Sequence, residues 1–163
     1  MLHVLEKLSR KLEGYRYRRN IVRALALHRR GEIRRDGLVP SSVTTRLEME
    51  WRARDIHPWD RRILSPAERA AAFVQQSLAD TEAAVYRLFA ALPQVDVIAL
   101  RVFDPTSGNL IISGSVSRAD TLARNEGISI GMRLRYLGLT YHLGGSQFEA
   151  LDYRPLHGAP ASR

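Results

Sequence analysis

The sequence predicts an α+β fold: a basic N-terminal helix followed by a mixed or antiparallel sheet with an αββαβ-like core. Three patterns support this prediction: helix-capping residues around a long apolar stripe at 65–92, two apolar runs flanking a turn at 104–108, and strand-like alternation over 43–53. With 45% hydrophobic and 26% charged residues, the chain has the composition of a globular protein. We divide it into a basic amphipathic helical arm (1–36), an α+β globular domain (40–152) and a flexible tail (153–163).

The arm is predicted from its apolar spacing. Leu5, Leu8 and Leu12 recur every three or four residues, which places them on one face of a helix over residues 2–30. Tyr15, Val22 and Ala26 extend the same stripe, and Gly31 follows it. The sequence therefore predicts an amphipathic helix at the N-terminus.

The arm also holds most of the net positive charge. The formal net charge of the chain is +8, and residues 1–36 contain eleven Lys and Arg against four acidic residues. Positive charge gathered in one segment favours an anionic partner. The candidate nucleic-acid-binding residues are Lys7, Arg10, Lys11, Arg16, Arg18, Arg19, Arg23, Arg29 and Arg30, with Tyr15 and Tyr17 between them for stacking on bases.

The first strand is predicted over residues 43–53. Apolar or β-branched residues such as Leu47 and Met49 alternate with charged ones such as Arg46 and Glu48. We expect the charged face to point to water, which favours an outer or antiparallel strand. The segment 56–60 (Ile-His-Pro-Trp-Asp) is predicted to break it as a turn, with Trp59 packed on the core.

A helix over 65–92 has the strongest local support. Ser65 can cap it, Pro66 suits the first helical position, and Glu68 completes a capping box. Pro93 is predicted to end it. We expect this helix to cover one face of the sheet.

The next segment predicts a hairpin with a central strand. Residues 95–103 are apolar on both faces, which is typical of a strand in the middle of a sheet. Residues 104–108 (Asp-Pro-Thr-Ser-Gly) favour a tight turn, in which Asp104 accepts backbone hydrogen bonds. Residues 109–117 then return as the antiparallel partner.

Residues 119–137 fit two patterns. Their apolar residues alternate as in a strand, but Ile130, Leu134 and Leu137 also fit a helix that Gly138 would end. We predict a broken helix here. Residues 139–143 and 148–151 are predicted to form a last hairpin around Gly144 and Gly145.

The order helix, strand, strand, helix, strand over residues 65–143, centred on the string 108–116 (GNLIISGSV), loosely resembles a BON domain. That resemblance implies association with phospholipid. BON domains usually follow an export signal, which we do not expect here, and the local match is a short hydrophobic and glycine-containing string, so we assign the chain to no family. Its longest apolar runs are far shorter than the roughly 18 residues of a membrane span. We expect a cytoplasmic location.

Catalytic chemistry has little support in the sequence. There is no cysteine, none of the five histidines has metal-ligand spacing, and no phosphate-binding loop or nucleophile motif is present. His57 and Asp60 could meet across a turn, but a structural role suits them better. Asp80, Glu82, Asp96 and Asp104 follow no metal-nuclease pattern. We expect no catalytic residue, no metal and no cofactor.

The arm admits three interpretations: contact with RNA, DNA or a nucleoprotein assembly, contact with an anionic membrane surface, or docking of its apolar stripe on protein. Contact with nucleic acid or a nucleoprotein assembly is our leading prediction, and it implies a non-enzymatic binding or adaptor protein. The alternative is a structural or membrane-peripheral protein–protein interaction module that docks through the amphipathic helix. An enzyme ranks third.

Overall fold

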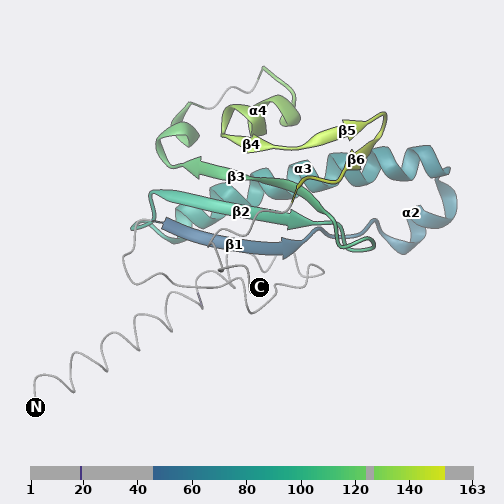
Figure 1. Ribbon diagram of the computed structural model, residues 1–163, viewed down its shortest axis with the longest axis horizontal. Helices are drawn as coiled ribbons and strands as arrows, with labels where there is room; N and C mark the ends of the chain where they lie inside the picture. Colours follow the sequence, from purple (N-terminus) through teal and green to yellow (C-terminus); the bar gives the residue numbers. More distant parts are fainter. Residues whose placement is uncertain (1–18, 20–45, 124–126, 153–163) are drawn as a thin grey trace, which may run out of the picture.

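The computed structural model describes residue 19, residues 46–123 and residues 127–152 (Figure 1). They form the predicted α+β fold, with a mixed sheet in the order β1–β2–β3–β4 and a second, two-stranded sheet, β5–β6. The strands are β1 (Arg46–Arg52), β2 (Val97–Phe103), β3 (Leu110–Ser117), β4 (Leu139–Thr140), β5 (His142–Gly144) and β6 (Gln147–Glu149). The helices are α2 (Pro58–Ile63), α3 (Pro66–Ala91), the 3-10 turn η3 (Ala119–Leu122) and α4 (Ile130–Tyr136). The predicted arm and tail lie outside the described residues, apart from Arg19.

Helix α3 begins at the capping box that the sequence predicts. The Ser65 hydroxyl accepts a hydrogen bond from the backbone N–H of Glu68 at 3.3 Å, and the Glu68 carboxylate accepts one from the N–H of Ser65 at 2.8 Å. Pro66 occupies the first position, where the missing N–H costs nothing. At the other end the helix stops at Ala91. Pro93 cannot donate to the carbonyl of Phe89 four residues earlier, so the helical ladder ends there.

A distant arginine supplies the missing donor. Arg118 follows β3, and its Nη1 donates to the Phe89 carbonyl at 3.0 Å. Its Nη2 donates to the Leu92 carbonyl at 2.7 Å, and its Nε donates to the Val95 carbonyl at 2.9 Å. The guanidinium also lies over the Phe89 ring, 4.8 Å from the ring centroid. The end of the β2–β3 hairpin is thereby fastened to the C-terminal end of α3, where a cation also complements the helix dipole.

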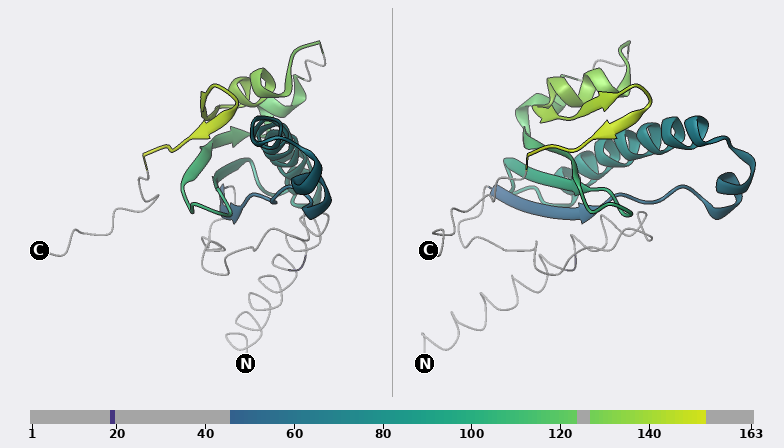
Figure 2. Two further views of the ribbon diagram at one scale, coloured as in Figure 1. Left: turned by 90° about the vertical axis from the view of Figure 1, so that its right-hand side faces the viewer. Right: turned by 45° about the vertical axis from the view of Figure 1, so that its right-hand side comes forward.

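Strand β2 is central, as predicted, and α3 covers one face of the sheet (Figure 2). The register pairs Leu47 with Ile98 and Met49 with Leu100, so these four buried side chains share that face. The buried apolar residues of α3 that complete this core are Val74, Leu78, Ala84, Val85, Leu88 and Phe89. Each fully buried side chain of this size contributes about 1.5–3 kcal/mol. The core therefore lies between α3 and the sheet.

Strand β1 is an edge strand that pairs in parallel with β2. Parallel pairing requires a crossover, which α2 and α3 provide. The expectation that the charged face of β1 points to water holds for Arg46, which is exposed, but not for Glu50. Glu50 lies opposite Arg101 in the register and forms an ion pair with it, and the two side chains are 16% and 11% exposed. Ala99, on the same face of β2, is also buried, so at this part of the face an ion pair takes the place of contact with water.

The β2–β3 hairpin is confirmed. Asp104 Oδ1 accepts hydrogen bonds from the N–H groups of Thr106 and Ser107, both at 2.7 Å, which closes the predicted turn. Gly108 takes a φ of +73°, a conformation that glycine adopts without strain. The predicted return segment 109–117 corresponds to β3 (Leu110–Ser117), which pairs antiparallel with β2.

The broken helix predicted over 119–137 is also confirmed, as η3 and α4, while residues 124–126 lie outside the described residues. Gly138 ends α4 with a φ of +89°. The last hairpin is confirmed in part: β5 and β6 pair around Gly145, but Leu139 and Thr140 form β4 and extend the main sheet beside β3. An ion pair between Arg133 and Glu82, with N–O distances of 2.6 and 2.9 Å, ties α4 to α3.

Candidate functional site

Of the eleven residues predicted to bind nucleic acid, Arg19 alone lies within the described part of the chain, where it is helical and exposed. The other ten are Lys7, Arg10, Lys11, Tyr15, Arg16, Tyr17, Arg18, Arg23, Arg29 and Arg30, which lie outside it. Their assignment stays a prediction.

His57 has a structural role in the described chain. It is the N-cap of α2, and its Nδ1 accepts a hydrogen bond from the N–H of Trp59 at 3.2 Å. The interpretation of 56–60 as a turn that packs Trp59 on the core was wrong. Residues 58–63 form α2, a helix with no buried residue, and Trp59 is 63% exposed. Pro58 begins this helix because a proline fits the first helical position.

The carboxylates considered for metal chemistry have other partners. Asp80 pairs with Arg54 at 3.1 Å and Glu82 pairs with Arg133, while Asp104 closes its own turn. Among residues 46–123 and 127–152, no three His, Asp or Glu side chains gather as a metal site would require. No helix of the described chain is long and apolar enough to cross a membrane.

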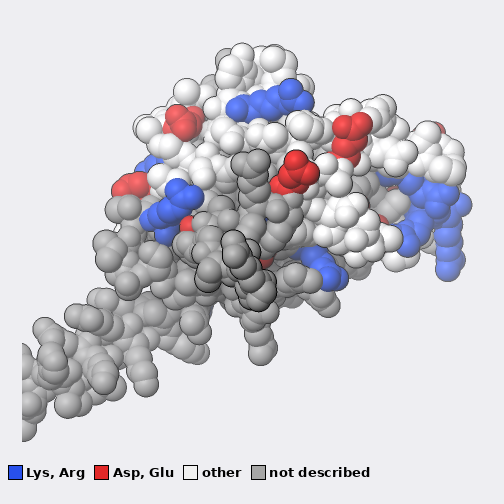
Figure 3. All heavy atoms as spheres, in the orientation of Figure 1, with Lys and Arg blue, Asp and Glu red and all other residues white. Residues whose placement is uncertain are grey.

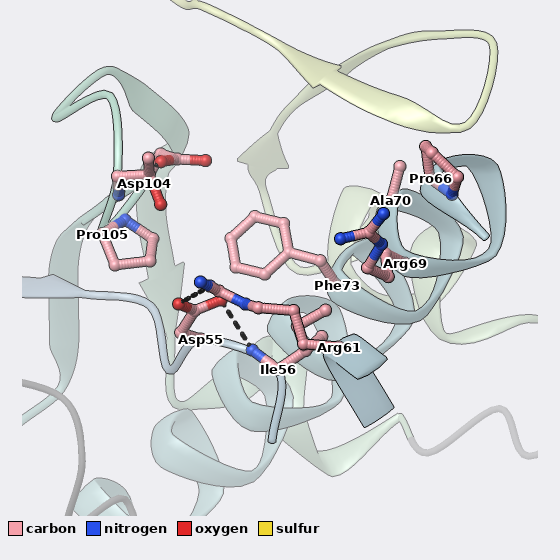
Figure 4. Close-up of a pocket in the computed structure, with 10 residues that line it drawn as sticks. Asp55, Ile56, Arg61, Pro66, Arg69, Ala70, Phe73, Asp104 and Pro105 are labelled. Atoms are coloured by element: carbon pink, nitrogen blue, oxygen red, sulfur yellow. Dashed lines mark hydrogen bonds and ion pairs between the residues drawn. The ribbon is translucent and has the colours of Figure 1, made fainter. Parts of the chain in front are cut away.

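A pocket lies where α2, the first turns of α3 and the β2–β3 turn meet (Figure 4). Its volume is about 400 Å³, and it is open to solvent on one side. Its lining comprises Asp55, Ile56, Arg61, Pro66, Arg69, Ala70, Phe73, Asp104, Pro105 and Thr106. The segment after β1 supplies the first two, and the hairpin turn supplies the last three. The edge of the sheet and the start of α3 therefore build one concave site.

Both carboxylates at the pocket accept hydrogen bonds within the described chain. Asp55 accepts the N–H of Ile56 through Oδ1 at 2.8 Å and forms an ion pair with Arg61 through Oδ2. Asp104 Oδ1 accepts the two backbone N–H groups of its turn. Neither carboxylate is arranged as an acid–base pair with the other.

Arg69 is in a different situation. It belongs to the second turn of α3, and its Nε atom is buried and donates to no acceptor in the described structure. The neighbouring Glu68 carboxylate is held by Ser65, and hydrogen bonds from the Ser65 side chain and then its backbone lower the pKa of Glu68. A buried guanidinium N–H without an acceptor costs free energy, because it has lost water and gained no partner. Arg69, which lines the pocket, thus carries a buried donor that lacks an acceptor in the described chain.

A second hollow shares four residues with the pocket and adds Pro58 and Arg62. The four shared residues are Asp55, Ile56, Arg61 and Arg69. Basic side chains gather at this end of the molecule, over α2 (Figure 3). Beside them, Trp59 and Ile63 are 63% and 66% exposed and lie four positions apart, on one face of α2. This end combines positive charge with exposed apolar surface.

Sequence reasoning missed this site. The signal available was the cluster Arg61, Arg62 and Arg69 around the capping box, but the site also needs residues 104–106, which reach it only through the fold. No protein-family model matches the chain, and comparisons with curated proteins and with solved structures found no significant match. The element order that resembles a BON domain is present from α3 to β4, and no family match accompanies it.

Proposed function

We propose that this chain is a non-enzymatic binding or adaptor protein whose basic N-terminal segment contacts nucleic acid or a nucleoprotein assembly. The observation that carries the proposal is the distribution of charge: residues 1–36 hold eleven Lys and Arg against four acidic residues, in a chain of net charge +8. Arginine side chains donate paired hydrogen bonds to phosphate oxygens, and neutralised phosphates release counterions. A dense basic segment therefore suits a phosphate backbone.

The folded domain offers a surface that would assist such contact. Arg61 and Arg62 lie on α2 beside the exposed Trp59. Aromatic rings stack on unpaired bases while neighbouring cations bind phosphates, and each stacked base contributes about 1–3 kcal/mol. This combination favours single-stranded nucleic acid over a duplex as the partner.

The test is a binding titration of the full-length protein with a labelled single-stranded RNA and a DNA duplex, read by fluorescence anisotropy over a range of salt. Contact with phosphates predicts that the logarithm of the affinity falls linearly with the logarithm of salt concentration, with a slope of about −0.7 to −0.9 per phosphate. The paired variant Arg18→Gln/Arg19→Gln is expected to weaken binding and to make that slope shallower.

A matched control removes the same charge elsewhere. Arg46→Gln/Arg52→Gln changes two arginines of β1, and we expect it to leave both affinity and slope close to those of the parent. Equal losses in the two double variants, or binding that does not vary with salt, would contradict the proposal. Binding to vesicles of anionic lipid with no binding to either nucleic acid would favour the membrane-peripheral alternative, in which Leu5, Leu8 and Leu12 insert.

A further inference from the structure

We propose that the pocket between α2, α3 and the β2–β3 turn binds a small organic oxyanion, a molecule that joins one carboxylate or phosphate group to an apolar body. This goes beyond the proposed function, because the pocket is formed by residues 55–73 and 104–106 and involves no residue of the basic arm. The argument rests on the donors, the acceptors and the walls of the pocket.

The first step is the unmet donor. Arg69 Nε is buried in the described structure and makes no hydrogen bond there. A planar guanidinium donates in a fixed fork that matches the two oxygens of a carboxylate or phosphate. An oxyanion in the pocket would supply the acceptor that this atom lacks, and at the same time it would neutralise the charge.

The second step is the sign of the remaining charge. Asp55 is neutralised by Arg61, whereas Asp104 accepts the N–H groups of Thr106 and Ser107 through Oδ1 and keeps its negative charge. Arg69 and Asp104 therefore carry the charges of the lining that no ion pair of the described structure cancels, and Arg69 makes no hydrogen bond at Nε. The formal charges of the lining cancel, so the preference for an anion rests on Arg69, whose buried Nε is the donor of the lining that lacks an acceptor in the described chain.

The third step concerns the walls. Phe73, Ala70 and Pro66 from α3 face Pro105 across the hollow (Figure 4). The Phe73 ring is held in place by an edge-to-face contact with Phe148 of β6, at 6.0 Å between centroids. The volume of about 400 Å³ lies within the range of about 300–1,000 Å³ that small-molecule sites occupy. The walls therefore suit an apolar or aromatic body of small-molecule size, which inorganic phosphate lacks.

The experiment uses four probes with the full-length protein: benzoate, phenyl phosphate, the neutral analogue benzamide, and inorganic phosphate. Binding is followed through the NMR shifts of the backbone amides of Arg69, Phe73 and Thr106. We expect benzoate or phenyl phosphate to shift these amides with an affinity at least about tenfold above that of benzamide and of inorganic phosphate, since a hydrogen bond to a charged group is stronger than one to a neutral group. The tighter of the two anions identifies whether carboxylate or phosphate is the preferred group.

Two variants and one control complete the test. Arg69→Gln removes the charged donor and is expected to lower the affinity for the anionic probe by about tenfold. Ala70→Leu keeps a helix-forming residue and fills the pocket, so it is expected to abolish binding. Arg46→Gln, on β1 and away from the pocket, is expected to bind as the parent does.

The proposal is overturned if benzamide binds as well as benzoate and phenyl phosphate, if none of the probes shifts the pocket amides, or if Ala70→Leu, folded by its NMR spectrum, binds as the parent does. The nucleic-acid proposal would be unaffected by these results, because its variants lie in the basic arm.

Discussion

Two arginines lie at opposite ends of α3, and the structure treats them in opposite ways. At the C-terminal end, Arg118 donates to the carbonyls of Phe89, Leu92 and Val95. In the second turn, Arg69 has a buried Nε with no acceptor in the described structure. Both are half-buried cations beside the same helix, so burial and charge alone do not separate their roles.

The difference lies in what each helix end needs. The C-terminal end exposes carbonyl groups without donors, and Pro93 adds one more because it has no N–H to offer Phe89. Arg118 donates hydrogen bonds to these carbonyl groups. The N-terminal end presents N–H donors, which the capping box of Ser65 and Glu68 satisfies, so this end offers no acceptor to the Arg69 guanidinium. An arginine whose N–H groups donate to the protein stabilises the fold. An arginine with an N–H group that has no acceptor in the protein is available to bind a ligand.

The largest effect is expected at the C-terminal end. Arg118→Met leaves buried carbonyls without their donors and is expected to lower the free energy of unfolding by about 3 kcal/mol. Urea unfolding followed by circular dichroism measures this change. Arg46→Met, at an exposed site on β1, is the control and should cost less than about 0.5 kcal/mol. A loss below about 1 kcal/mol for Arg118→Met would mean that water replaces the guanidinium and that the contrast between the two ends is smaller than we infer.

The capping box predicts a smaller effect at the other end. Ser65→Ala removes the acceptor of the Glu68 N–H and is expected to destabilise the protein by about 1 kcal/mol in the same urea experiment. Ser115→Ala, an exposed serine on β3, serves as the matched control with an expected change within about 0.5 kcal/mol. An unchanged midpoint for Ser65→Ala would indicate that Pro66 alone positions the start of α3.

Arg69 is expected to contribute least to stability. Arg69→Met removes a buried donor that has no acceptor, so the free energy of unfolding should change by less than about 0.5 kcal/mol or increase slightly. Thermal and urea unfolding without added ligand give the answer. A loss comparable with that of Arg118→Met would place both arginines in the same structural class and would remove the basis for the ligand proposal.

A pH dependence sharpens the comparison further. Because hydrogen bonds with Ser65 lower the pKa of Glu68 in the folded chain, its ionised form favours folding above the ordinary glutamate value of about 4.3. That contribution is lost as the pH falls through the lowered value. The difference in stability between the parent and Glu68→Gln should therefore be present near neutral pH and shrink in acid. A difference that is constant down to strongly acidic pH would show that the carboxylate charge plays no part.

The features predicted correctly from the sequence depend on residues close together in the chain. The capping box of α3, the turn at Asp104 and the end of α4 at Gly138 each need fewer than ten consecutive residues. The two-sided hydrophobicity of 95–103 identified the central strand because a strand between two others is buried on both faces.

Features that depend on distant residues were not predicted. The alternation over 43–53 indicates which residues share a face of the strand, but it does not indicate which strand lies beside it. The parallel pairing of β1 with β2 and the Glu50–Arg101 ion pair could therefore not be predicted. Helix α2 is short and buries nothing, which leaves no periodicity to detect. The pocket joins Asp55 and Arg69 to a turn more than thirty positions later, and that proximity comes from the sheet. The predicted nucleic-acid site lies in the arm and awaits the binding titration.

The parallel register of β1 has a consequence for the speed of folding. Residue 46 pairs with residue 97, whereas β2 and β3 are joined by a turn of a few residues. Contacts between residues far apart in the chain form slowly, because a long segment must be ordered before they repay the lost entropy. We expect the hairpin to form first and β1 to dock last, after α3 has bridged the gap. Until then the unpaired edge of β2 can pair with a strand from another chain. Docking of β1 covers this edge and so prevents intermolecular strand pairing during folding.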